Sequence, residues 1–226
     1  MAAVMERTAT PQGGVLTLAY GGFPPSLVDL KSRLAANIQG LKPEQPGSLW
    51  PKTTIGCLQD RARLTPDQLQ SLLNLSAAHS QAFASFSDAC LEVDRAEVVV
   101  YQSRSLERSL SLQSVPLQGR PLHLDANLPS REQQSNVQRV MAEAEAADYW
   151  IDVSKDGNRR AHYDGAALGV TLVHYIVEQG GQCRGSAQPV LDAIRAFRVA
   201  VDDALPDLYH WFDDEALHVT LRALIN

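Results

Sequence analysis

The chain has 226 residues, of which 45% are hydrophobic and 20% are charged, and its formal net charge is −6. This length and composition are typical of a globular protein that buries its own core without disulfide or metal staples. The acidic balance excludes a general basic surface for nucleic acid, so any such binding must be local.

Cysteine use and the N-terminal sequence indicate the compartment. Cys57, Cys90 and Cys183 are odd in number and lack close pairing, which argues for a reducing compartment and against a disulfide framework or a zinc knuckle. Residues 1–14 contain no apolar signal-peptide core, and no apolar run approaches the membrane-spanning length of about 20 residues. We therefore expect a cytoplasmic protein with no membrane partner, no cofactor and no metal site.

The first part of the chain predicts strand, helix and strand. Residues 15–20 form an apolar run closed by glycines and prolines, which indicates a strand. Ser26 is the expected N-cap of a helix that continues to about residue 38. Residues 50–58 then predict a second strand.

This second strand has two different faces, because successive side chains of a strand point to opposite sides. Lys52 and Thr54 share the polar face, and we expect Ile55 and Cys57 to lie together on the other face. We therefore expect the side chains of Lys52 and Thr54 to point to the same side of the sheet.

The middle of the chain predicts a helix, a pair of strands and a boundary. Thr65 and Gln68 form a capping box that begins the helix. Residues 97–101 and 109–117 are the two strands, joined by a polar bend. The proline-containing stretch 119–129 is the predicted boundary between two lobes.

The second half repeats the order of strand, helix and strand after one extra helix. Ser130 caps the extra helix, which continues to about residue 147. Residues 169–177 form an apolar strand that we expect to be buried on both faces, and residues 189–205 form an amphipathic helix. The last strand covers residues 216–224.

The last strand alternates between an apolar face and a polar face. His218, Thr220 and Arg222 share the polar face, and Val219 and Leu221 belong to the apolar face that must cover a core. His218 and Thr220 are roughly 7 Å apart along the strand, a spacing that suits two groups holding one small anion. The alternative is an edge strand whose polar face only contacts solvent.

Two similar four-residue motifs thus lie on equivalent strands, and here the chain resembles the two-histidine phosphoesterase superfamily, which includes LigT proteins and cyclic phosphodiesterases. That family carries His-x-Thr followed by an apolar residue twice, once in each lobe. The stretch from His218 to Leu221 matches fully, and the stretch from Lys52 to Ile55 matches except that Lys52 replaces the first histidine. The resemblance covers residues 15–117 and 167–224, and the elements that follow the second motif in the family are missing.

The resemblance implies a metal-free opening of a cyclic phosphate. One histidine serves as general base and the other as general acid, because their pKa lies near neutral pH. The threonine hydroxyls hold the non-bridging oxygens of the phosphate. His218, Thr220, Lys52 and Thr54 are accordingly the expected catalytic residues. An ordinary lysine pKa is about 10.4, so Lys52 can act as an acid only if a dry pocket lowers its pKa.

Four further side chains are candidates for substrate binding. Arg222 is a candidate because it shares the polar face of the last strand, and Tyr101 because it ends the strand over residues 97–101. Arg104 follows in the polar bend, where a solvated role is the alternative. His162 lies in an expected irregular loop, from which it could replace the missing histidine.

These observations predict an α+β fold of two lobes, each a mostly antiparallel sheet with outer helices, around a central cleft. Residues 1–118 form the first lobe with a tail over residues 1–14, residues 119–166 the connection, and residues 167–226 the second lobe. The expected function is hydrolysis of a cyclic phosphate or phosphodiester on a nucleotide or RNA end. The alternative is a catalytically degenerate module that binds a phosphorylated ligand or a protein partner.

Overall fold

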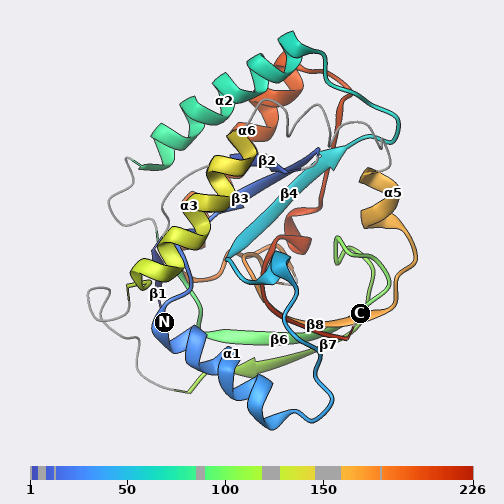
Figure 1. The fold of residues 1–226 in the computed structure, drawn as a ribbon. Coiled ribbons are helices and arrows are strands. Elements are labelled where there is room, and N and C mark those ends of the chain that lie inside the picture. The colour runs from blue at the N-terminus through green and yellow to red at the C-terminus, as the bar shows by residue number, and fades with distance from the viewer. Residues whose placement is uncertain are drawn as a thin grey trace.

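The computed structural model describes residues 2–4, 9–12, 14–84, 90–118, 128–145, 159–178 and 180–225. It contains two antiparallel sheets of four strands each and one two-stranded sheet, together with helices that lie outside them (Figure 1). The predicted α+β class is therefore confirmed. The predicted boundary stretch lies mostly outside the described residues.

The first sheet has the strand order β2-β3-β4-β9, and all its neighbouring strands are antiparallel. Its strands are β2 (Ala9–Gln12), β3 (Val15–Ala19), β4 (Lys52–Leu58) and β9 (Tyr209–Trp211). Strands β3 and β4 are those predicted from the apolar patterns. β9 was not predicted, and it brings a segment from the C-terminal part of the chain into a sheet of N-terminal strands.

The second sheet has the order β10-β8-β6-β7 and is also antiparallel. Its strands are β6 (Arg95–Tyr101), β7 (Ser109–Pro116), β8 (Gly169–Tyr175) and β10 (His218–Ile225), and the small third sheet pairs β1 (Ala2–Val4) with β5 (Cys90–Glu92). Both large sheets combine strands from before and after residue 119.

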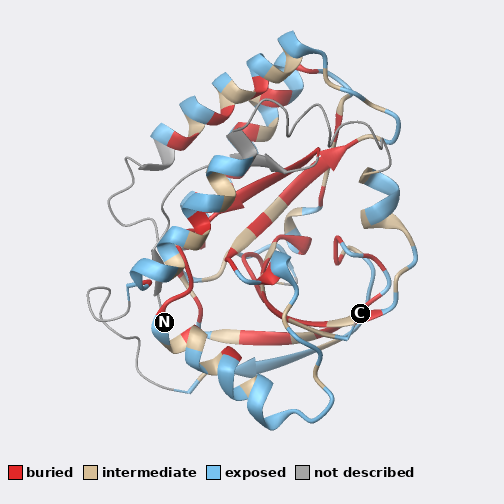
Figure 2. Ribbon diagram, in the orientation of Figure 1, coloured by how far each residue is buried: buried red, intermediate tan, exposed pale blue. Residues whose placement is uncertain are grey.

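The α-helices of the described residues are α1 (Pro25–Asn37), α2 (Pro66–Ala84), α3 (Arg131–Glu145), α5 (Arg159–Asp164) and α6 (Gln188–Ala204). The described part of the chain also forms the short 3₁₀ helices η1 (Pro46–Ser48), η3 (Gly185–Ala187) and η4 (Asp214–Ala216). Figure 1 shows α2 alongside α6, α3 beside them, and α5 on the other side of β4. Most of the outer helical surface and strand β7 are exposed, whereas β3, β4, β6 and β8 are largely buried (Figure 2).

Local sequence signals fix most of the helix starts. Thr65 and Gln68 form the predicted reciprocal cap of α2: the Thr65 N–H donates to Gln68 Oε1 at 2.9 Å, and the Gln68 N–H donates to Thr65 Oγ1 at 3.3 Å. The predicted N-cap of α1 is wrong by two residues. Pro24, not Ser26, precedes the helix, because Pro25 already has the backbone geometry of a first helical position.

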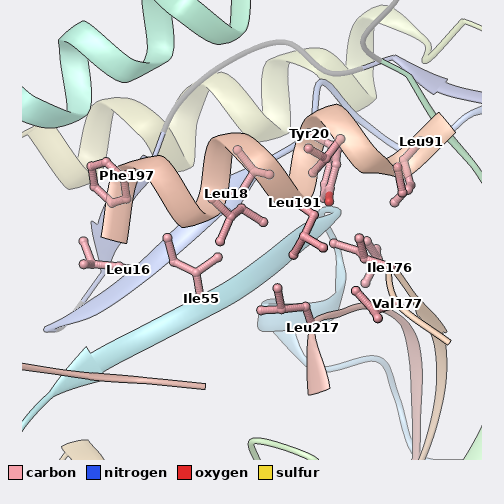
Figure 3. Packing of buried hydrophobic residues seen from close by; sticks show 14 of the residues in the cluster. Leu16, Leu18, Tyr20, Ile55, Leu91, Ile176, Val177, Leu191, Phe197 and Leu217 are labelled. Carbon is pink, nitrogen blue, oxygen red and sulfur yellow. The ribbon is translucent and has the colours of Figure 1, made fainter. Parts of the chain in front are cut away.

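One large hydrophobic core joins the two sheets through α6. Leu16, Leu18 and Ile55 from the first sheet pack near Leu191 and Phe197 of α6 (Figure 3). The same cluster includes apolar residues of β6, β8 and β10 from the second sheet. Strands β4 and β10, one from each sheet, also contact each other directly.

Within the described residues, none of the helices has the length and apolar character needed to cross a membrane.

Candidate active site

A pocket of about 200 Å³ collects the predicted catalytic residues from both sheets. Lys52 and Thr54 reach it from β4, and His218 and Thr220 reach it from β10. All four side chains are half-buried. The two threonines thus line one pocket, as predicted from the strand faces.

Each motif strand carries a β-bulge directly after its threonine. In β4, Thr54 pairs with Thr17 and Gly56 pairs with Leu16, so Ile55 is the extra residue. In β10, Thr220 pairs with Val173 and Arg222 pairs with Leu172, so Leu221 is extra. Ile55 and Leu221 are both almost completely buried. A bulge ends the simple alternation of faces, which changes where the following side chains point.

Arg222 is the predicted site residue that the structure places elsewhere. Because of the bulge at Leu221, Ala223 lines the pocket, whereas Arg222 points away from it and is buried elsewhere. There its guanidinium donates to the Lys42 carbonyl at 2.7 Å and pairs with Glu44 at 3.2 Å. The prediction that Arg222 shares the face of His218 is therefore wrong.

The corresponding bulge in β4 separates Ile55 from Cys57. Ile55 belongs to the main core, whereas Cys57 packs with Val15, Phe212 and Tyr163 next to the pocket. The prediction that Ile55 and Cys57 share a face is therefore also wrong. Burial, followed by nearby carboxylates, raises the pKa of the Cys57 thiol to about 12, so this thiol stays neutral near pH 7.

His218 is held in one tautomer by the backbone that precedes it. Its Nδ1 lies 2.7 Å from the carbonyl oxygen of Ala216, and because a carbonyl only accepts, Nδ1 carries the proton. The other nitrogen, Nε2, then has the free lone pair that a general base needs. Burial lowers the pKa of His218 to about 4, so the imidazole is neutral near pH 7.

Lys52 is oriented by two contacts at the other side of the pocket. Its ammonium donates to the carbonyl of Gly47 at 2.7 Å and lies 4.2 Å from the centre of the Trp50 ring. Desolvation lowers the pKa of Lys52 to about 8. The lysine is therefore mostly protonated at neutral pH but can lose its proton close to it.

Three side chains around the pocket complete its predicted lining. Tyr101 ends β6, and Arg104 follows in the turn after it. His162 also lines the pocket, but from the short helix α5 and not from an irregular loop, so that part of the prediction is wrong. Burial, followed by the charges of Arg104 and Arg159, lowers the pKa of His162.

Tyr163 is a pocket residue that the sequence analysis did not select. It forms a side-chain hydrogen bond with Thr54, and burial raises its pKa to about 12. Its ring also packs at 5.0 Å from the ring of Phe212. The only sequence signal was its place beside His162, because the contact with Thr54 depends on how α5 lies against β4.

A cluster of possible metal ligands lies beside the pocket. One ligand atom from each of Glu107, Asp164 and His210 lies within 4.8 Å of the others. These residues are far apart in the sequence, so no spacing motif revealed them. Asp164 already pairs with Arg160 at 3.0 Å, and Glu107 accepts the Asp213 N–H at 3.0 Å. Asp164 and Glu107 are therefore already engaged by other groups of the protein.

A second, larger pocket of about 440 Å³ adjoins the first and shares Leu106 with it. Tyr175 lines the larger pocket, and its ring lies at 6.0 Å from the ring of His218 in an edge-on contact. Ala216, whose carbonyl holds His218, also lines it. His218 thus lies close to both pockets.

No family model, no curated protein and no solved structure matches this chain.

Proposed function

We propose that the protein is a phosphoesterase that opens a cyclic phosphate, or cleaves a phosphodiester, on a nucleotide or RNA end without a metal ion. The observation that carries the proposal is the meeting of Lys52, Thr54, His218 and Thr220 in one pocket. Two hydroxyls, one ammonium and one neutral imidazole are the groups that a metal-free hydrolysis of this kind needs.

His218 is the proposed general base. Its Nδ1 proton is held by the Ala216 carbonyl, so Nε2 can take a proton from the attacking water as the oxygen bonds to phosphorus. A bound phosphate anion raises the pKa of a nearby histidine, because it stabilises the protonated form. The pKa of His218 therefore moves toward neutral pH when substrate is bound, and the base becomes stronger.

Lys52 is the proposed general acid. As the bond from phosphorus to the leaving oxygen breaks, the ammonium donates its proton to that oxygen, and the charge of the phosphate is then held by Thr54 and Thr220. The lowered pKa of Lys52, about 8, supports this role, because a group with the ordinary lysine pKa would release a proton much less readily. Water restores both groups after release of the product.

The second candidate function is phosphate binding without turnover. It is favoured by the hydrogen bond from Lys52 to Gly47 and the Trp50 ring beneath the ammonium, since both contacts also stabilise a fixed charge. A permanently charged Lys52 would hold a phosphate group but would not supply a proton.

Substitution of Lys52 separates the two candidates. Initial rates on a 2′,3′-cyclic nucleotide, and ligand affinity at low and high salt, are measured for the native protein, Lys52→His and Lys52→Ala. If Lys52 is the acid, the native protein turns the substrate over and Lys52→Ala is slower by about 10²–10⁴-fold. If Lys52 only binds, Lys52→His is the fastest, and Lys52→Ala loses affinity mainly at low salt.

Two controls keep the result interpretable. Arg33→Gln removes an exposed ion pair of α1 away from the pocket and should leave both rate and affinity unchanged. Treatment with EDTA should leave the native rate unchanged, whereas a loss that zinc or magnesium restores would contradict the metal-free reaction. Absence of both binding and turnover for every phosphorylated compound tested would contradict both candidate functions.

A further inference from the structure

The loop between α1 and β4 contacts Lys52 of the pocket and also a cluster of three largely buried charged residues, Lys31, Glu44 and Arg222. This loop covers residues 42–50 and includes η1. On the pocket side it provides the Gly47 carbonyl and the Trp50 ring that hold Lys52. The position of the Lys52 ammonium therefore depends on where this loop lies.

On its outer side the same loop is tied to two elements by three charged side chains. Glu44 of the loop pairs with Lys31 of α1 at 2.6 Å and with Arg222 of β10 at 3.2 Å. The side chains of Lys31, Glu44 and Arg222 are only 10%, 17% and 4% exposed. Ion pairs this well buried hold a defined geometry, because a displaced partner leaves an unpaired charge away from water.

The two cations also bind the loop backbone directly. Lys31 donates to the Ser48 carbonyl at 2.7 Å, next to Gly47, and Arg222 donates to the Lys42 carbonyl at 2.7 Å. Ser48 Oγ donates to the Gln45 carbonyl at 3.1 Å within the loop. The loop is thus fixed near both ends and next to the carbonyl that accepts from Lys52.

The groups that face Lys52 across the pocket offer it no counterion. They are His218 of β10, Tyr101 of β6, Arg104 in the turn after β6, and His162 and Tyr163 of α5. No carboxylate lines this pocket among the described residues. The loop contacts and the dry surroundings therefore set the state of the ammonium.

From these contacts we propose that Arg222, Glu44 and Lys31 are positioning residues for the pocket, and that they hold the Lys52 ammonium in place through the loop of residues 42–50. The proposal rests on the proposed function for its effect on catalysis. The bulge at Leu221 contributes to this arrangement, because it turns Arg222 away from the pocket and toward the Lys42 carbonyl of the loop. If the cluster is lost, the loop loosens, water reaches Lys52, and its pKa rises toward the ordinary lysine value.

The test measures Lys52 itself. The chain has only four lysines, Lys31, Lys42, Lys52 and Lys155, so ¹³C-methylated lysine side chains give a simple NMR spectrum in which Lys52 is assigned by its loss in Lys52→Arg. The pH titration of the Lys52 signal is compared in the native protein, Glu44→Gln and Arg222→Met. Glu44→Gln changes the loop without altering a strand, so it serves even if Arg222→Met fails to fold. Arg33→Gln is the matched control for loss of an ion pair.

A rise in the pKa of Lys52 in Glu44→Gln, with the control unchanged, is the expected result. If the native protein turns over a cyclic nucleotide, the basic limb of its pH–rate profile should move to higher pH by the same amount. An unchanged or lowered Lys52 pKa in folded Glu44→Gln overturns the inference, whether or not the protein is an enzyme. If the pKa of Lys52 rises in Glu44→Gln but the native protein does not turn over any cyclic nucleotide, the positioning role is supported and only the proposed reaction is contradicted.

Discussion

The pKa values of Lys52 and His218 are both lowered, and burial is the main cause for each. Burial disfavours the charged form of each, so the pKa of Lys52 falls to about 8 and that of His218 to about 4. Between these two values the lysine carries a proton and the histidine does not. This is the protonation state that an acid and a base need at the start of a hydrolysis.

The first prediction concerns His218 and the pH dependence of the rate. His218→Ala should lower turnover of a 2′,3′-cyclic nucleotide by about 10²–10⁴-fold, because the base is lost. In the native protein the rate should rise with pH as His218 loses its proton and fall above about pH 8 as Lys52 loses its proton. Steady-state rates between pH 4 and 10 check both limbs. If His218→Ala keeps the native rate and the rate still rises with pH in the acidic range, His218 is not the base.

At the scale of single elements, β10 combines core packing with placement of the site. Val219 and Leu221 face the core while His218 and Thr220 line the pocket. The bulge at Leu221 lets this residue stay buried and turns Arg222 away from the pocket. Strand β10 therefore contributes residues to the pocket, to the core and to the charged cluster of Lys31, Glu44 and Arg222.

The second prediction separates these roles of β10 by stability. Leu221→Ala should destabilise the protein by about 2–5 kcal/mol, the range for truncating a fully buried leucine. Ile225→Ala, in the same strand but 62% exposed, is the control and should cost much less. His218→Ala should also cost less than Leu221→Ala, because His218 borders a pocket. Denaturant unfolding gives the three values, and the reverse order would mean that the faces of β10 are exchanged.

At the scale of the whole molecule, both sheets depend on one interior that includes an uncharged histidine. His174 of β8 is completely buried, and its Nδ1 contacts the Arg95 carbonyl at 2.9 Å. Desolvation lowers its pKa to about 4, from the ordinary value of 6.5. In the unfolded chain the same imidazole takes up a proton near pH 6.5.

The third prediction follows from this difference. As the pH falls from about 6.5 to 4, the unfolded state gains a proton at His174 before the folded state does, so stability is lost across this window, by up to about 3 kcal/mol. His174→Gln should flatten this part of the stability curve. Melting curves of the native protein and His174→Gln at pH 4.5 and pH 8 check it. At pH 8 the histidine is neutral in both the folded and the unfolded state, so this measurement gives the effect of the substitution without the protonation. An equally steep loss in the variant would assign the acid sensitivity to other groups.

Much of the pocket was predictable because its residues are encoded by local patterns. Alternation within residues 50–58 and 216–224 placed Lys52 with Thr54 and His218 with Thr220. Helix caps and apolar runs likewise predicted most of the long helices and strands. These signals act over a few residues, so they survive in any tertiary context that buries the apolar face.

The tertiary structure alone decided the features that depend on a partner strand or a distant segment. Arg222 and Cys57 lie past bulges, and a bulge exists only relative to the register of the neighbouring strand. β9 is a three-residue strand defined by its pairing with β4, and Tyr163 reaches Thr54 only because α5 lies against that strand. The lowered pKa of Lys52 likewise comes from desolvation, and the pocket that buries it is completed by residues of β6, α5 and β10 that no local pattern brings together.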